Sequence, residues 1–202
     1  SPGHKTVATF NDRLFGVPLY ADVSALFYNK DLFTEAGLHP TKRPTSLAEM
    51  REYADKITAL GGGVSGYYLP GNCAGCNIFT VGPLMWASGA KIEAEKAGDE
   101  PLTGDGVKQV PQFTRDMVKA ANTHAGDRTE NGETFHLQFG SGKVGMMGTG
   151  NFNITLARQQ NPTMKFGISL LPGATPGSYA SFIGGDLVVV PKGSKRVADS
   201  VN

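Results

Sequence analysis

The sequence predicts an α/β fold in which helices flank a mixed sheet. Patterns typical of strands alternate with patterns typical of helices along the chain. The segment 23–28 is apolar on both faces, as expected for a central strand. Residues 47–60 carry apolar side chains at helical spacing, directly after the capping box that Ser46 forms with Glu49.

Composition restricts the class of protein. The chain has 202 residues, enough for one large domain or two small ones, and its 27 glycines fit a fold with many turns. A net charge of +1 gives no electrostatic footprint for nucleic acid or an acidic membrane surface. No apolar run approaches the roughly 18 residues of a membrane span, and the first residues lack the apolar core of a secretion signal. The protein is therefore expected to be cytosolic, or exported with its signal already removed.

The first predicted elements are a hairpin, the central strand and a short helix. Alternating residues at 7–10 lead into Asn11 and Asp12, which predicts a hairpin ahead of the central strand. Asn29 is placed to cap the short helix, and Gly37 supplies the positive φ that ends it.

Further strands and helices alternate through the rest of the chain. They are predicted to be strands at 64–69, 144–147, 166–170 and 186–190, helices at 78–88, 107–121 and 154–160, a surface hairpin at 91–103, and a last helix opening at 192–195. Pro83 is expected to kink the first of these helices, and Pro111 to interrupt or start the second. Asn131 is expected to cap a short helix that carries Phe135 and Phe139.

Cys73 and Cys76 form a lone CxxC pair in the glycine-rich segment GNCAGCN. Without a second pair, a four-cysteine zinc site is excluded. A short-loop disulfide is the favoured interpretation, and free thiols or a metal or redox role remain as alternatives.

Patterns for nucleotide, metal and nucleophile chemistry are incomplete. The glycines of residues 61–66 match a dinucleotide fingerprint, but they follow a helix and precede a strand, which is the reverse of the required order. His124 and His136 lie near acids in a stretch typical of a surface loop. No Gly-x-Ser-x-Gly elbow is present. We therefore expect no metal, no cofactor and no enzymatic activity.

Several blocks of sequence resemble a known family. GVP at 16–18, an acid four residues after that proline (Asp22), YNKDLF and AGL are followed by FGSGKVGMMGTGNF, FGISLLPG and GGDLVVVPKGSK. With these blocks in this order, the chain resembles the extracellular solute-binding proteins of ABC importers that carry sugars. The resemblance covers nearly the whole sequence.

The resemblance implies one lobe of a type II periplasmic-binding-protein fold. Such proteins have two lobes, and their chain crosses between them at the GVP and GGD blocks. The crossings are expected near 16–24 and 184–192, so that 1–202 forms a single solute-binding lobe. The N-terminal lobe and the C-terminal helices would be absent. Family members are exported, which implies a periplasmic or extracellular location.

A mechanism follows from the same resemblance. Two lobes close about a hinge over a small carbohydrate or polyol, and the closed form docks on the permease subunits of the ABC transporter. Half of the ligand contacts would belong to the other lobe, so this chain alone is expected to bind sugar weakly or not at all. Its inner face is then expected to be available for self-association.

Candidate ligand-binding residues are neutral polar and aromatic groups at strand-to-helix turns, where ligands of open α/β sheets bind. Aromatic faces cover the C–H patches of sugars, and polar groups bond their hydroxyls. The predicted contacts are Tyr20, Asp22, Asn77, Phe79, Asn151, Phe152, Gly185 and Asp186. Tyr179 and Ser181 are weaker candidates for the same wall.

Each candidate also has a purely structural alternative. Asp22 stands where the family has an acid facing the sugar, and it is otherwise a turn carboxylate. Phe152 stands where the family usually has a tryptophan that stacks on the ligand. Its alternative role is simple packing within the protein. Asn77 and Asn151 are otherwise helix caps, and Phe79 is otherwise core. The alternative for Gly185 and Asp186 is that they form a tight turn that contacts no ligand.

Two other functional classes remain open at this stage. A hydrolase would use Asp22 with Asp186 as a carboxylate pair, which a retaining glycosidase holds about 5–5.5 Å apart. An interaction or redox module would instead be built around Cys73 and Cys76, and it would require accessible sulfur atoms.

Overall fold

A computed structural model describes residues 5, 6, 8–92, 96 and 100–201. The chain divides into two compact units. The larger unit is residues 24–182, and the smaller unit combines residues 1–23 with 183–202.

The sheet of the larger unit is built around one strand, β4 (Asp22–Asn29), whose first two residues belong to the smaller unit. It pairs in antiparallel fashion with β6 (Val144–Gly150) and with β7 (Phe166–Ser169). On the far side of β6 lies β5 (Ser65–Tyr68), which runs parallel to it. The predictions of a central strand and of a mixed sheet are confirmed.

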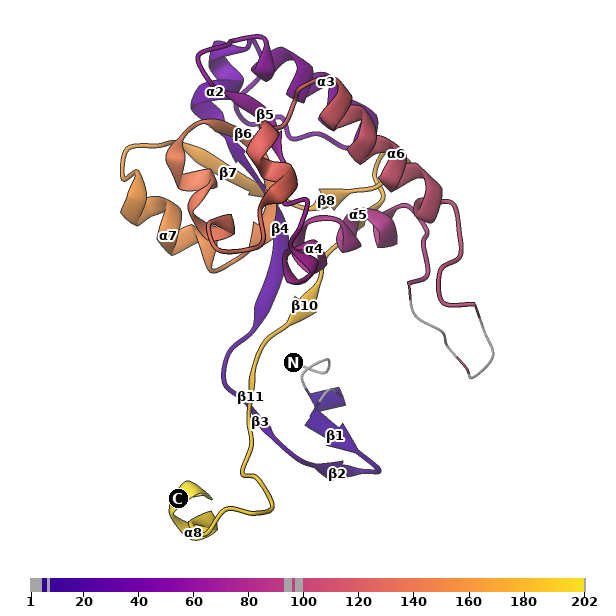
Figure 1. The fold of residues 1–202 in the computed structure, drawn as a ribbon, viewed down its shortest axis with the longest axis vertical. Helices are drawn as coiled ribbons and strands as arrows, with labels where there is room; N and C mark the ends of the chain where they lie inside the picture. Colours follow the sequence, from indigo (N-terminus) through magenta and orange to yellow (C-terminus); the bar gives the residue numbers. More distant parts are fainter. Residues whose placement is uncertain (1–4, 7, 93–95, 97–99, 202) are drawn as a thin grey trace. The chain divides into compact units, whose positions relative to one another are not determined.

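Helices cover both faces of this sheet, as predicted (Figure 1). The helices are α2 (Lys30–Glu35), α3 (Leu47–Thr58), α4 (Ala74–Thr80), α5 (Gly82–Ala87), α6 (Gly106–Lys119) and α7 (Asn153–Gln160), with 3₁₀ turns η1 (Ala125–Thr129), η2 (Phe135–Leu137) and η3 (Phe139–Ser141). One core contains residues of α2, α3, α5 and α6, and the other contains residues of α4, α7 and the turns η2 and η3. A short pair, β8 (Leu171–Pro172) and β9 (Tyr179–Ala180), lies next to α5.

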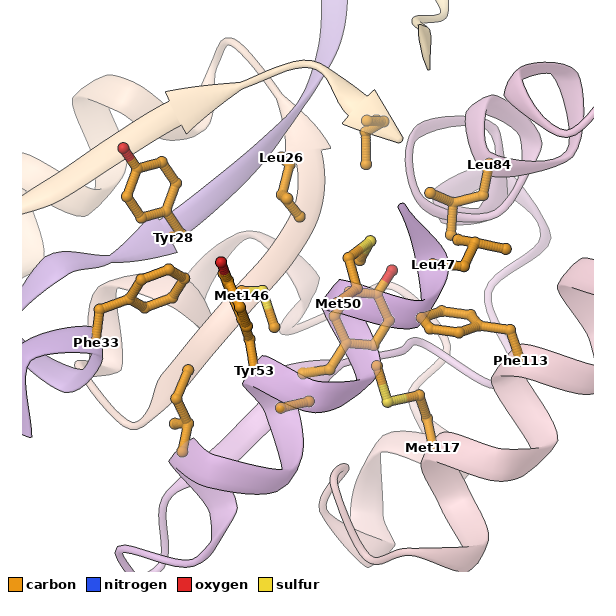
Figure 2. Close-up of a cluster of buried hydrophobic side chains, with 14 of the residues drawn as sticks. Leu26, Tyr28, Phe33, Leu47, Met50, Tyr53, Leu84, Phe113, Met117 and Met146 are labelled. Carbon is orange, nitrogen blue, oxygen red and sulfur yellow. The ribbon is translucent and has the colours of Figure 1, made fainter. Parts of the chain in front are cut away.

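The first core joins β4 to the helices through aromatic contacts. Figure 2 shows Tyr28 from β4, Phe33 from α2 and Tyr53 from α3 side by side. The ring centroids of Tyr28 and Phe33 are 5.0 Å apart, and those of Phe33 and Tyr53 are 5.7 Å apart. Tyr28 also lies against β7, where a Cβ on Gly167 would be 2.1 Å from its ring. This contact explains why the facing position of β7 is glycine.

The second core lies on the opposite face of β4. Phe27 is fully buried there, stacked on Phe166 of β7 and edge-on to Phe139 of η3. Because neighbouring residues of a strand point to opposite faces, the apolar run of β4 supplies both cores at once.

Two helix caps agree with the sequence. The Asn29 side chain accepts hydrogen bonds from the backbone N–H groups of Asp31 and Leu32, at 3.0 and 3.2 Å. Ser46 caps α3 through the N–H of Glu49, at 3.2 Å. The Glu49 carboxylate, however, accepts from the backbone N–H of Thr45 at 2.6 Å, so the reciprocal bond reaches one residue further back than a capping box predicts.

The predicted helix 78–88 is wrong in its bounds, because two helices occupy this region. The first, α4, begins at Ala74, and the sulfur of Cys73 accepts the N–H of Cys76 as its cap. The second, α5, has Pro83 in its first turn. Proline has no N–H to donate, so within a continuous helix one backbone bond would be lost, whereas in the first turn of a new helix that N–H would have no intrahelical partner in any case.

Other boundaries also differ. Two 3₁₀ turns replace the short helix predicted after Asn131, whose side chain accepts the N–H of Glu133 in a local turn. Helix α6 starts at Gly106 and continues through Pro111. The predicted hairpin 91–103 is joined by a bridge between its two end residues, while residues 93–95 and 97–99 of it lie outside the described residues.

The smaller unit contains short paired strands. Its elements are β1 (Thr9–Phe10), β2 (Arg13–Leu14), β3 (Val17–Pro18), β10 (Ile183–Gly184), β11 (Leu187–Val188) and α8 (Val197–Val201). The β1–β2 hairpin turns at Asn11 and Asp12, which have positive φ values of 47° and 57°, as predicted. The strand predicted at 186–190 is reduced to β11, and the last helix begins later than predicted. Throughout the described residues, every helix is too short or too polar to span a bilayer.

Gly66 provides a test of the packing between α3 and β5. A methyl group added there would lie 2.2 Å from the carbonyl oxygen of Ala54, and backbone cannot move aside cheaply. Gly66→Ala is therefore expected to lower the free energy of unfolding by at least about 2 kcal/mol, measured by urea denaturation. Gly75→Ala, at an open position on α4, is the matched control and should be neutral or slightly stabilising. Equal effects of the two substitutions would contradict this packing.

Candidate functional site

In the smaller unit, four of the predicted contacts lie on neighbouring segments. Strand β3 pairs with β11, and the backbone N–H of Leu19 donates to the carbonyl of Asp186 at 2.8 Å. The hydroxyl of Tyr20 donates to the Asp186 carboxylate. Gly184 lies opposite Asp22 in the pairing of β10 with β4. The structure thus brings Tyr20 and Asp186 into contact and places Asp22 and Gly185 within a few residues of them.

The backbone at Gly185 requires glycine. Its φ is +139°, and a Cβ would lie 2.0 Å from the carbonyl oxygen of Tyr20. The close approach fixes the segments around Tyr20 and Gly185 against each other inside this unit. Whether the Gly185 N–H meets a ligand remains a prediction.

The bond between Tyr20 and Asp186 has an electrostatic consequence. The carboxylate accepts a hydrogen bond from the neutral phenol, and its negative charge disfavours a second negative charge nearby. Both effects raise the pKa of Tyr20 above its ordinary value. The phenol therefore stays a neutral hydrogen-bond donor over the physiological range, and Asp186 is engaged as its acceptor.

In the larger unit, the aromatic candidates form a cluster of three rings. The ring of Phe79 on α4 lies edge-on to Phe152, with centroids 5.6 Å apart, and edge-on to Phe182, with centroids 5.1 Å apart. All three rings are partly exposed. We call these residues the phenylalanine cluster. Its rings carry no polar atom, so the cluster offers only apolar faces and edges.

Backbone contacts hold two members of the phenylalanine cluster in place. The ring of Phe152 lies over Gly150 at the end of β6, where a Cβ would be 2.2 Å from it. The N–H of Phe182 donates to the hydroxyl of Ser24 at 2.7 Å, and its carbonyl accepts the Ser24 N–H at 3.0 Å. Phe182 was not predicted, although Ser181 beside it was. The phenylalanine of the SFIGG segment could have been named as an aromatic candidate beside the glycine turn. Its position, however, is set by Ser24, which is far away in the sequence.

The polar candidates of the larger unit flank these rings in the sequence. Asn77 lies inside α4, not at its start, so its predicted alternative as a helix cap is wrong. Its side-chain oxygen accepts the hydroxyl of Thr80 at 3.2 Å. Asn151 precedes α7, whose N-cap position is taken by Phe152 without any side-chain bond. Asn151 is exposed and Asn77 partly exposed. As ligand contacts, both remain predictions.

The cysteine pair braces the start of α4. Cys73 and Cys76 form a disulfide with their Cα atoms 5.2 Å apart, and each residue is 7% exposed. Gly132 packs directly on it, because a Cβ there would be 3.0 Å from the Cys73 sulfur. A redox module needs reachable sulfur atoms, so this burial argues against that alternative.

A buried carboxylate stabilises the loop beside the disulfide. Asp127 is 6% exposed and accepts the N–H of His124 at 3.0 Å, and its own carbonyl accepts the N–H of Gly71 at 2.8 Å. Burial raises the pKa of Asp127 to about 6, although the bond from His124 opposes the shift. Among the described residues, no group of three or more histidines, cysteines or acids is arranged to hold a metal ion.

Comparisons with known proteins agree with this architecture. Residues 2–200 match the family of bacterial extracellular solute-binding proteins. A putative binding protein of Brucella abortus is 29% identical over 189 residues, 94% of this chain and 45% of the relative. A mannitol-binding protein of Pseudomonas aeruginosa is 27% identical over 188 residues, 90% of this chain and 42% of the relative.

A solved structure matches the whole fold. It is a solute-binding protein of an ABC transporter from Thermotoga lettingae, bound to α-D-tagatose, with a TM-score of 0.86 and 24% identity. The match covers 100% of this chain and 51% of that one. The chain thus spans about half the length of the proteins it resembles. The family and this structural neighbour are both described as solute-binding proteins.

The buried carboxylate of Asp127 predicts a pH dependence of stability. Its pKa is higher in the folded chain than in the unfolded chain, so the folded state binds the proton more tightly. Relative to Asp127→Asn, the parent should gain up to roughly 2–3 kcal/mol of unfolding free energy as the pH falls from about 7 to about 4. Urea denaturation across this range measures the difference. For Asp105→Asn, at an exposed position, the plot of unfolding free energy against pH should run parallel to that of the parent. If the plot for Asp127→Asn were also parallel to that of the parent, the prediction would be contradicted.

Proposed function

The chain belongs to the family of bacterial extracellular solute-binding proteins, and from this premise we propose that it is part of the substrate-binding subunit of an ABC importer for sugars or related polyols. The subunit works outside the cytoplasm, in the periplasm or at the cell surface, and delivers its ligand to permease subunits in the membrane. The names of its relatives support this ligand class, since they include a mannitol-binding protein and a tagatose-bound receptor.

The phenylalanine cluster is the observation that carries the proposal. A sugar or polyol presents C–H faces and hydroxyl edges, and aromatic rings bind the C–H faces. Phe79 and Phe152 meet edge-to-face and are both partly exposed, so that each ring has surface left for a ligand. The proposed polar contacts, Asn77 and Asn151, are neutral amides suited to hydroxyl groups.

In the smaller unit, the proposed contacts are acceptors and backbone donors. Asp22 accepts a ligand hydroxyl, and the N–H of Gly185 donates to one. Tyr20 and Asp186 hold each other by their hydrogen bond, so that they present a fixed pair to the ligand. A ligand selects the closed form only through contacts that exist in that form, which is why these residues would act together with the other half of the receptor.

The other half of the receptor is proposed to come from sequence beyond this chain. The chain would form one lobe, with crossings near 16–24 and 184–192. Exposed apolar side chains on the smaller unit support a missing partner surface, since Val17, Leu19 and Val188 are 63%, 66% and 50% exposed. In the absence of that half, a second copy of the chain is expected to cover this surface.

A thermal-shift screen tests the ligand class. The full-length receptor is expected to gain about 2.7 kcal/mol at a ligand concentration of 100 Kd, seen as a rise in Tm with mannitol, tagatose or a related solute. The 202-residue chain should shift much less with the same solute, because half of the contacts are missing. A full-length receptor that responds to no sugar or polyol, but to an amino acid or a peptide, would refute the proposed ligand class.

Phe152→Ala tests the phenylalanine cluster directly. Loss of an aromatic face should weaken binding of the solute found in that screen by about tenfold or more, measured by titration calorimetry on the full-length receptor. Phe10→Ala removes an equally large ring that is 69% exposed on the β1–β2 hairpin, and it should leave Kd within about twofold. Equal losses for both substitutions would show that Phe152 has no special part in binding.

A further inference from the structure

The larger unit carries a hollow with a volume of about 680 Å³, lined by residues of β7, of the start of α2 and of the end of α7. Figure 1 shows where these three elements lie in the unit. The charged lining of the hollow is Lys30, Arg158 and Lys165. We call it the basic hollow. Among the residues that the structure describes, no acidic side chain forms a salt bridge with any of these three cations.

The apolar part of the basic hollow comes from β7 and from Pro162 and Met164 in the loop before it. Phe166 and Ile168 share one face of this strand. Phe166 is packed on Phe27, whereas Ile168 is 45% exposed although it lies directly opposite the buried Phe27. At Ile168 the strand therefore leaves the core and presents an exposed apolar side chain in the same lining as the cations.

One acid lies beside the basic hollow. The carboxylate of Asp31 on α2 accepts the backbone N–H of Lys165 at 3.0 Å and keeps its negative charge there. Three cations and one carboxylate leave a local excess of positive charge, which the net charge of +1 for the whole chain conceals. Such an excess raises the local concentration of anions within a Debye length.

Protection of an edge strand explains only part of this arrangement. Among the described strands, β7 pairs only with β4, and lysine on such an edge prevents pairing with other chains. That role accounts for Lys165, which directly precedes β7. It does not account for Lys30 or Arg158, which belong to helices, and it would favour a polar residue where Ile168 is exposed.

We propose that the basic hollow binds the head group of an anionic phospholipid, so that this face of the larger unit rests on a membrane surface. Cations beside exposed aliphatic side chains are the combination that an anionic bilayer interface binds. The concave shape admits one head group, and Ile168 contacts the first methylene groups. A free inorganic anion would gain nothing from this side chain. The inference is independent of the ligand that the receptor carries.

Vesicle flotation of the purified chain tests this inference. Vesicles of phosphatidylglycerol mixed with phosphatidylcholine in equal amounts are compared with vesicles of phosphatidylcholine alone, at about 0.1 M salt, where the Debye length is about 10 Å. The chain is expected to float with the mixed vesicles only, and to be released at about 1 M salt. Absence of binding to the mixed vesicles overturns the proposal.

Paired variants locate the contact. Lys30→Gln combined with Lys165→Gln should lower the partition coefficient about 30-fold, since each basic residue at an anionic surface contributes about 1 kcal/mol. Lys108→Gln combined with Lys119→Gln removes the same charge from exposed positions on α6 and should change it less than about twofold. Equal losses for the two pairs would indicate general charge attraction and would overturn the assignment to the basic hollow.

A last pair distinguishes a lipid from a free anion. Ile168→Ser should weaken partitioning about threefold, whereas Leu102→Ser, which removes a side chain 59% exposed in a loop, should have little effect. Inorganic phosphate at about 10 mM should not release the chain beyond the effect of matched ionic strength. Release by phosphate together with no effect of Ile168→Ser would assign the hollow to a soluble anion and overturn the lipid proposal.

Discussion

The structure depends on a strand that has no solvent-facing side along most of its length. From Leu26 to Tyr28, β4 is paired on one edge with β6 and on the other with β7. Its alternating side chains enter two separate cores, with Leu26 and Tyr28 on one face and Phe27 on the other. Helices must therefore cover both faces, because either face left open would expose large aromatic groups to water. The α/β architecture follows from this requirement.

The same strand positions the proposed ligand-binding surface. Ser24 on β4 fixes Phe182 by two hydrogen bonds. Gly150 lies opposite Ser24, on β6, and the ring of Phe152 packs on it. Phe79 is then held between two rings whose backbones are set by the sheet. A surface held in this way loses little conformational entropy when a ligand binds, so that more of the contact energy remains for affinity.

Local signals explain what the sequence could predict, and distant contacts explain what it could not. Asn29 and Ser46 were identified as caps because a cap depends only on the next three residues. The start of α4 at Ala74 was missed because Cys73 caps it through sulfur, which no standard capping pattern includes. Phe182 was missed because its position depends on Ser24, at the other end of the unit's sequence. The predicted polar contacts likewise depend on groups that are distant in the sequence or outside it, because a ligand and a second lobe would determine which of them are used.

The two proposed binding surfaces act through different physics, and this difference lets one chain carry both. A neutral cluster such as that around Phe79 acts only in contact, after water has left, and an ionised side chain there would lose hydration without a partner. The cations around Lys30 keep their hydration and act over about 10 Å, with little dependence on the detailed shape of the partner. Selectivity for a neutral solute therefore has to come from the phenylalanine cluster together with the proposed polar contacts, while the basic hollow can affect only where the receptor resides. A mutation that changes the charge of the hollow should leave solute selection intact, because a solute without charge does not sense that field.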